Sequence, residues 1–311
     1  MNRRLTILVQ IRDALARRVA DALPEHTVLT IPTSGELPAT DAEVLLTLPW
    51  AGPNLGEVLA RGVRWVHVLG TGVDAFPFHE LGDQLLTCSR GGSAIPIAEW
   101  VLAVMLAFEK RLPDAWITQP PPEGWSRTHL GGLYGKTLAL VGIGGIGTAV
   151  AERARAFGMI VRAHRRSASP APPGVELASS LLDLAASADH LVLAAPATGA
   201  THHLLDRSVF AAIKPNAHVV NIARGSLIDG EALRDALDSG RVAMASLDAV
   251  DPEPLPAGHW MYGHPRVRLS PHVSWSMPGA ADPLVDRFIE NLRRWRAGAP
   301  LDGVVDRDAG Y

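Results

Sequence analysis

The sequence contains a single cysteine, Cys88, among its 311 residues. One cysteine excludes an intrachain disulfide framework and a cluster of thiolates around a metal. The formal charge is only −3, so no net positive field attracts nucleic acid or an anionic membrane surface. No apolar run reaches the roughly 18 residues of a membrane helix, and the N-terminal residues lack a secretory signal pattern. We therefore expect a cytoplasmic protein that binds neither nucleic acid nor membrane.

Short apolar runs alternate with helical patterns along almost the whole chain, which favours parallel sheets with helical crossovers. The length corresponds to about two domains. Strands are predicted at 5–9, 44–46, 65–68 and 84–87, and in a second series at 138–141, 160–163, 190–193, 218–221, 243–246 and 267–269. Helices are predicted at 12–22, 97–112, 148–157 and 283–297. The 97–112 segment is apolar nearly all round, which predicts a helix buried between two bodies.

A glycine motif follows the first strand of the second series. Gly142, Gly144 and Gly147 form the pattern G-x-G-x-x-G, and a predicted helix comes next. In this context the three glycines permit a tight turn, the approach of a pyrophosphate and close packing of helix and strand. Gly145 and Ile146 complete the segment, whose N–H groups would face the phosphates. A turn without a ligand is the alternative, but the strand–turn–helix order favours a dinucleotide site.

The next strand ends in basic residues instead of an acidic one. NAD-binding proteins of this type carry a carboxylate about 20 residues after the motif, where it binds the ribose 2′-hydroxyl. Here no acidic residue lies between positions 153 and 175, and the strand end reads His164, Arg165, Arg166 and Ser167. Guanidinium groups and a hydroxyl suit a 2′-phosphate. This predicts a preference for NADP(H), with NAD(H) as second choice; a solvated arginine pair is the alternative.

Arg224, Glu253 and His272 each follow a different predicted strand. Since the carboxyl ends of parallel strands meet at one edge of a sheet, we expect these side chains to gather there. Arg224 can bind a carboxylate through a bidentate fork and polarise the adjacent carbonyl. His272, held in its protonated form by Glu253, can donate a proton to a developing alkoxide. Singly, these residues also fit a turn, a surface charge and a packed loop histidine, but together they predict a reducing site.

The order of these motifs resembles that of the D-isomer-specific 2-hydroxyacid dehydrogenase family, over nearly the whole chain. The resemblance rests on the segments 142–147, 221–225, 248–254 and 270–272, together with 70–74 and 94–112. It implies an α/β fold with a Rossmann-type, doubly wound parallel sheet domain for the cofactor at residues 94–275. This domain would be inserted into a smaller flavodoxin-like α/β substrate domain made of residues 1–93 and 276–311.

The resemblance also assigns roles to individual residues. Arg224, Glu253 and His272 correspond to the family's catalytic triad, and Arg224 and His272 would also contact the substrate. Backbone N–H groups around Leu69, Gly70, Thr71 and Gly72 would hold the substrate carboxylate. Pro196, Ala223 and Asp248 are expected on the cofactor side. Trp50, after a predicted strand, is a candidate wall of the substrate pocket, with a surface or core tryptophan as the alternative.

Two departures from the family pattern refine the prediction. Val250 stands where the family often has an aromatic residue, and the basic strand end matches the NADP-using glyoxylate and hydroxypyruvate reductase branch. The carboxylate of Glu253 argues against the formate dehydrogenase branch, which has an amide there. We predict NADPH-dependent reduction of a small 2-oxoacid by a homodimer without a metal site. The alternatives are a dinucleotide-sensing or corepressor-like module without turnover, and an NAD-dependent dehydrogenase of a larger 2-hydroxyacid.

Overall fold

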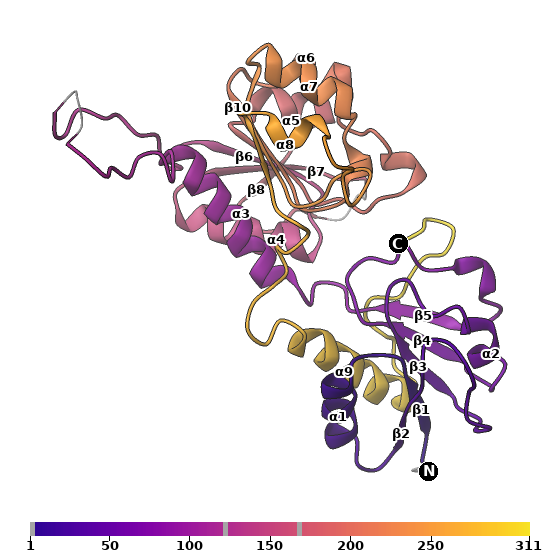
Figure 1. The fold of residues 1–311 in the computed structure, drawn as a ribbon. Helices are drawn as coiled ribbons and strands as arrows, with labels where there is room; N and C mark the ends of the chain where they lie inside the picture. The colour runs from indigo at the N-terminus through magenta and orange to yellow at the C-terminus, as the bar shows by residue number, and fades with distance from the viewer. Residues whose placement is uncertain (1–3, 121–123, 167–169) are drawn as a thin grey trace. The chain divides into compact units, whose positions relative to one another are not determined.

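The computed structural model describes residues 4–120, 124–166 and 170–311. The chain forms two compact units, shown in Figure 1. Unit 1 comprises Met1–Ser93 and Met277–Tyr311, and unit 2 comprises Ala94–Ser276. The chain thus passes between the units twice, after Ser93 and after Ser276. The roles of the two units as substrate domain and cofactor domain stay predictions at this point.

Unit 1 is built on a five-stranded parallel sheet in the order β2-β1-β3-β4-β5. Its strands are β1 (Thr6–Val9), β2 (Thr27–Thr30), β3 (Val44–Thr47), β4 (Trp65–Val68) and β5 (Leu85–Cys88). Its helices are α1 (Asp13–Ala22), α2 (Leu55–Leu59), the short η1 (Phe78–Glu80) and α9 (Asp282–Ala297). This strand order is the flavodoxin-like one.

Both faces of this sheet are buried because alternate residues of a strand point to opposite faces. In β1, Ile7 and Val9 join the cluster formed with α1 and α9, whereas Leu8 joins the cluster formed with α2. Figure 1 shows α1 and α9 side by side on their face of the sheet. Continuous apolar strands such as β3 and β4 are explained by this two-sided burial.

Unit 2 contains a seven-stranded parallel sheet in the order β12-β11-β10-β9-β6-β7-β8. Its strands are β6 (Thr137–Val141), β7 (Ile160–His164), β8 (Val175–Leu177), β9 (His190–Leu193), β10 (Ala217–Asn221), β11 (Val242–Leu247) and β12 (Val267–Leu269). Its helices are α3 (Ala94–Glu109), α4 (Gly145–Ala156), α5 (Leu181–Ser187), α6 (Arg207–Ala212), α7 (Gly230–Asp238) and α8 (Trp260–Gly263), with the short η2 (Gly199–Thr201) and η3 (Gly225–Leu227). The order runs outward from β6 in both directions, so the sheet is doubly wound.

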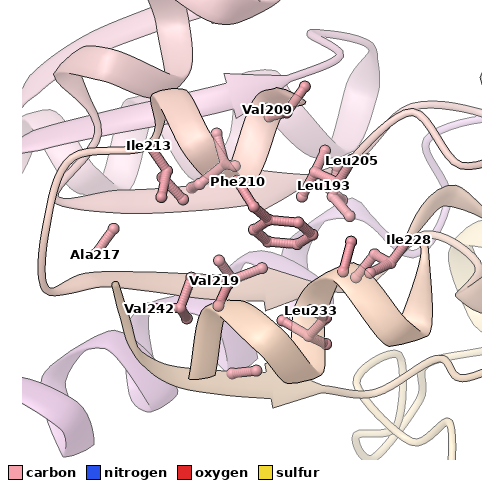
Figure 2. Close-up of a cluster of buried hydrophobic side chains, with 14 of the residues drawn as sticks. Leu193, Leu205, Val209, Phe210, Ile213, Ala217, Val219, Ile228, Leu233 and Val242 are labelled. Atoms are coloured by element: carbon pink, nitrogen blue, oxygen red, sulfur yellow. The ribbon is translucent and has the colours of Figure 1, made fainter. Parts of the chain in front are cut away.

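Two apolar clusters cover the two faces of this sheet. Leu138 and Leu140 of β6 pack with α3 and α4, and Ala139 on the opposite face packs with α5, α6 and α7. Figure 2 shows the second cluster, in which Phe210 of α6 lies among strand and helix residues that include Leu193. Burial of such aromatic and branched side chains is the main favourable term for folding.

The predicted fold class is confirmed: a doubly wound parallel sheet is inserted between two parts of a smaller, flavodoxin-like unit. The strands β2 and β8 were not predicted, because both are short edge strands that are half-buried or exposed and therefore lack a continuous apolar run. The helix α4 begins at Gly145, three residues earlier than predicted, since the last glycine of the motif lies within its first turn. No helix in the described part of the chain combines the length and apolar character required to cross a membrane.

A chain of polar side chains, all buried except the half-buried Lys136, crosses the sheet of unit 2. Lys136 Nζ donates to Glu109 Oε1 at 2.5 Å, and His190 Nε2 lies 3.0 Å from the same oxygen. His190 Nδ1 lies 3.2 Å from His218 Nδ1, and His218 Nε2 lies 2.9 Å from Ser246 Oγ. Each of these polar groups therefore has a partner, as burial requires.

Burial also fixes the protonation of two histidines. Desolvation lowers the pKa of His218 well below its ordinary value, and the adjacent His190 lowers it further. In unit 1, burial lowers the pKa of His67 to about 3, with a further contribution from the charge of Arg287. Both imidazoles are thus neutral in the folded protein and take up a proton on unfolding below about pH 6.5. Because the unfolded chain binds more protons in that range, acidification destabilises the fold.

We therefore expect the free energy of unfolding to decrease below pH 6.5, by up to about 1.4 kcal/mol per pH unit for each of these histidines. His218→Gln removes one of the two groups, so the variant should show a shallower dependence on pH whatever its stability at pH 7. His129→Gln, at an exposed position, is the control and should keep the native slope. Urea unfolding between pH 5 and pH 8 measures all three slopes; an unchanged slope in His218→Gln would contradict a buried neutral imidazole.

Candidate functional site

The glycine motif forms a turn that is closed toward the protein and open on its other side. Gly142 has a φ of +95°, and a Cβ there would lie 2.8 Å from the backbone of Ala194 and Ala195. A Cβ on Gly147 would lie 2.5 Å from the carbonyl oxygen of Gly142. At Gly144, by contrast, an added Cβ meets nothing within 4 Å. Glycine is therefore required for packing at two positions, and the third leaves the backbone accessible.

This open side lies at the topological switch point of the sheet. β6 and β9 are neighbours, while the chain runs outward from β6 through β7 and from β9 through β10. α4 begins at Gly145, with Gly144 as its N-cap and no side-chain capping bond there, and Ile146 packs in the adjoining core. A helix N-terminus with accessible N–H groups at a switch point fits the phosphates of a dinucleotide.

The basic residues lie at the end of β7, the strand next to β6. The carbonyl oxygen of His164 accepts a hydrogen bond from Gly142 N at 2.9 Å, which joins this strand end to the glycine turn. Nε and Nη2 of Arg165 are buried and have no hydrogen-bond partner among the described residues. Buried guanidinium nitrogens without an acceptor are costly, so the site suits an anionic group. Arg166 is exposed, and Ser167 lies outside the described residues.

Two of the predicted cofactor residues belong to the loops after β9 and β10. Pro196 follows β9, and its carbonyl oxygen accepts from Thr201 Oγ1 at 2.8 Å. Ala223 follows β10 and is buried. Both therefore lie at the same edge of the sheet as the glycine turn.

Arg224 is the residue before η3, in the loop after β10. Its Nη1 donates to the carbonyl oxygen of Ala223 at 2.7 Å. The next residue, Gly225, lies directly against the loop after β11, since a Cβ there would be 1.9 Å from the carbonyl carbon of Val250. The loop with Arg224 and the loop leading to Glu253 are therefore in backbone contact.

Glu253 and His272 form a hydrogen-bonded pair. His272 Nδ1 lies 2.7 Å from Glu253 Oε1, with side chains 36% and 40% exposed. Because an ionised carboxylate only accepts, Nδ1 carries the hydrogen and Nε2 is left for chemistry. His272 has a φ of +54°, and Trp275 Nε1 donates to its carbonyl oxygen at 2.9 Å. A partly exposed imidazole with one nitrogen held by a carboxylate is the arrangement of a general acid or base.

Asp248 binds the loop that carries His272. The buried Asp248 carboxylate accepts from Ser270 Oγ, from Val273 N at 2.9 Å and from Ser274 N at 2.9 Å. The sequence placed Asp248 on the cofactor side; in the structure its oxygens are directed to the 270–274 loop. Its structural effect is to order that loop.

The predicted substrate loop belongs to unit 1. The N–H groups of Leu69 and Gly70 donate to the carbonyl oxygens of Thr47 and Val68, so they are engaged within the unit. This narrows the expected carboxylate-binding groups to the N–H groups of Thr71 and Gly72.

Trp50 also belongs to unit 1. It follows β3 and is 64% exposed, so it is a surface tryptophan in this unit and not a core one. Its role as a wall of the substrate pocket stays a prediction.

Some residues that shape the site were not named as site residues from the sequence. They are Asn221, Ser270, Ser274 and Trp275, which act through hydrogen bonds within the loops. Their only sequence signal is proximity to Arg224 and His272. Within the described part of the chain, no three histidine, cysteine or acidic side chains gather as metal ligands would.

The doubly wound sheet, its glycine turn and the histidine–carboxylate pair define a dinucleotide-binding oxidoreductase. Residues 102–274 match the model of the D-isomer specific 2-hydroxyacid dehydrogenase, NAD binding domain. The chain belongs to the D-isomer specific 2-hydroxyacid dehydrogenase family and is an NAD(P)-dependent enzyme. The resemblance inferred from the sequence motifs is thereby confirmed.

Individual relatives carry different names. The chain is 32% identical over 290 residues to glyoxylate/hydroxypyruvate reductase A of Serratia proteamaculans (strain 568), covering 88% of this chain and 90% of the relative. It is 33% identical over 307 residues to D-3-phosphoglycerate dehydrogenase of Methanocaldococcus jannaschii, covering 94% of this chain but 57% of that relative. A D-isomer specific 2-hydroxyacid dehydrogenase from Xanthobacter autotrophicus Py2, solved in complex with NADPH and MES, matches with a TM-score of 0.87 and 26% identity, over 99% of this chain and 100% of that chain.

Proposed function

We propose that the protein reduces a small 2-oxoacid, of the glyoxylate or hydroxypyruvate type, to the 2-hydroxyacid, with NADPH as the preferred reductant. The observation that carries this proposal is the 2.7 Å contact between His272 Nδ1 and Glu253 Oε1 at the sheet edge that also carries Arg224 and the glycine turn. The named function of the Serratia relative supports the substrate class. Unit 2 is the cofactor domain in this proposal, and unit 1 supplies the substrate loop.

The three residues of the triad have different tasks. Arg224 binds the substrate carboxylate and polarises the carbonyl through its guanidinium group. Bound NADPH supplies the hydride for the carbonyl carbon. His272 donates the proton from Nε2 to the developing alkoxide oxygen, and Glu253 holds Nδ1 so that Nε2 faces the substrate. In the oxidative direction, neutral His272 accepts that proton.

A panel of 2-oxoacids assayed with NADPH tests the function as a whole. Glyoxylate or hydroxypyruvate should give the highest kcat/KM. NADPH binding without oxidation across the panel would instead identify a dinucleotide sensor. Faster turnover of larger 2-oxoacids with NADH would identify the alternative dehydrogenase.

Arg165 Nε and Nη2, which are buried without a hydrogen-bond partner among the described residues, support the cofactor preference. We expect NADPH to exceed NADH in kcat/KM by at least ~10-fold, equivalent to about 1.4 kcal/mol. Arg165→Ala should reduce this ratio by raising the KM for NADPH, because only NADPH carries the 2′-phosphate. Arg207→Ala, at an exposed arginine on α6, is the control. Equal use of both cofactors by the native enzyme would refute the preference.

Removal of the proton donor should affect kcat most. His272→Ala is expected to lower kcat by ~10² to 10⁴, the usual scale for a positioned acid, while the dissociation constant for NADPH is unchanged. Glu253→Gln should cause a smaller loss, since the amide keeps the shape but not the charge. His202→Ala, at an exposed histidine, is the control for steady-state kinetics. Near-native kcat in His272→Ala would show that the proton comes from another group.

The segment between α3 and β6 carries exposed aromatic side chains, and we infer from them that the protein is a homodimer. Figure 1 shows its described residues, 110–120 and 124–136, extending away from the sheet of their own unit. Trp116 and Trp125 on this segment are 74% and 76% exposed, and Tyr134 near its end is 87% exposed. Large aromatic side chains left exposed along a projecting segment are typical of an association surface, and a second copy of the chain is the partner we propose.

Light scattering at micromolar concentration should give twice the chain mass of 33.1 kDa. The double substitution Trp116→Ser and Trp125→Ser should shift the equilibrium toward the monomer, because it removes apolar surface from the association face. Trp50→Ser, in unit 1, is the matched control. A native particle of one chain mass would overturn the proposed assembly.

A further inference from the structure

Asn221 is a wholly buried amide at the end of β10. Its Nδ2 donates to the carbonyl oxygen of Arg224 at 2.9 Å and to that of Ala249 at 3.1 Å. Its Oδ1 accepts from Ala223 N at 3.0 Å. One side chain therefore binds the backbone of the loop with Arg224 and the backbone of the loop after β11.

The same residue is linked to the third loop of the triad. The carbonyl oxygen of Asn221 accepts from Asp248 N at 2.9 Å. The carboxylate of Asp248 in turn accepts from Ser270 Oγ and from Ser274 N, in the loop with His272. A short buried path of hydrogen bonds thus joins the ends of β10, β11 and β12, which are neighbours in the sheet.

We propose that Asn221 is a positioning residue for the reaction: it fixes the backbone of Arg224 relative to the loop that leads to Glu253. This inference rests on the proposed function, in which Arg224 binds the oxoacid. Two carbonyl acceptors face Nδ2, and an amide supplies the two N–H donors that they need. A carboxylate of the same shape has no donor, so Asn221→Asp would place oxygen against two carbonyl oxygens without changing side-chain size.

Loss of the hydrogen bonds from Asn221 Nδ2 would displace the guanidinium group of Arg224, because it would release the backbone of Arg224 itself. The carbonyl that Nδ2 binds belongs to Arg224 itself, and the adjacent Gly225 packs against Val250 with no room for a side chain. A displacement of the loop therefore moves the oxoacid-binding group relative to Glu253 and His272. A misplacement of about 1 Å costs on the order of 10²-fold in rate, whereas the glycine turn after β6 is left in place.

The experiment compares Asn221→Asp with Asn216→Asp, which makes the same chemical change at an exposed turn residue of unit 2. Asn221→Asp should lower kcat/KM for glyoxylate on the order of 10²-fold, with a raised KM for the oxoacid and a much smaller change in the dissociation constant for NADPH. Asn216→Asp should match the native enzyme. Asn221→Ser, which keeps a single donor, should give an intermediate loss and serves if the aspartate variant does not fold.

Amide hydrogen exchange provides a readout that does not depend on turnover. The amide of Ala223, which donates to Asn221 Oδ1, should exchange faster in Asn221→Ser than in the native protein and in Asn216→Asp. If the native protein turns over no oxoacid, the proposed function fails. The exchange rate of the Ala223 amide still tests whether Asn221 holds the backbone of this loop. The positioning role is overturned if Asn221→Asp and Asn221→Ser keep native kcat/KM, if Ala223 exchanges at the native rate, or if NADPH affinity and oxoacid kinetics fall by the same factor.

Discussion

The parallel arrangement of the strands in unit 2 is the constraint on which the site depends. Because all seven strands run in the same direction, residues that are more than a hundred positions apart in the sequence end up at one edge. Gly142 follows β6, Arg224 follows β10 and His272 follows β12. No single segment of the chain contains all of these residues; they come together because the strands run in the same direction. Hydrogen bonds from side chains at the strand ends, such as Asn221 and Asp248, then hold the loops close to one another.

Histidines at the two ends of this sheet have opposite environments. Near the amino ends of the strands, His190 and His218 lie fully buried in a chain of hydrogen bonds from Lys136 to Ser246. At the carboxyl edge, His272 is partly exposed and has one nitrogen held by Glu253. The first arrangement gives every imidazole nitrogen a hydrogen-bond partner, and burial lowers the pKa of His218, which is a structural use of the residue. The second leaves a nitrogen available, which is what proton transfer requires.

The sequence predicts the central strands well because buried parallel strands read as continuous apolar runs. The edge strands β2 and β8 do not meet this criterion, since none of their residues is fully buried. The glycine motif and the triad were recognisable because each follows a strand. The hydrogen bonds that the N–H groups of Leu69 and Gly70 donate could not be predicted, because they depend on how the loop turns back onto β3 and β4. The bridging role of Asn221 is likewise a property of three loops together, and no local pattern encodes it.

The relatives carry the names of enzymes with different substrates. Proteins named as a glyoxylate/hydroxypyruvate reductase and as a phosphoglycerate dehydrogenase match this chain at similar identity. Membership of this family therefore defines a class of reaction and not a substrate. Discrimination has to arise where side chains are free to vary without moving the triad. In the proposed function, the end of β7, with Arg165, would be such a place for the cofactor, and the loops after β3 and β4 of unit 1 would be such places for the oxoacid. In our proposal, the hydrogen bonds from Asn221 through Asp248 to Ser270 hold the triad in place independently of these outer segments.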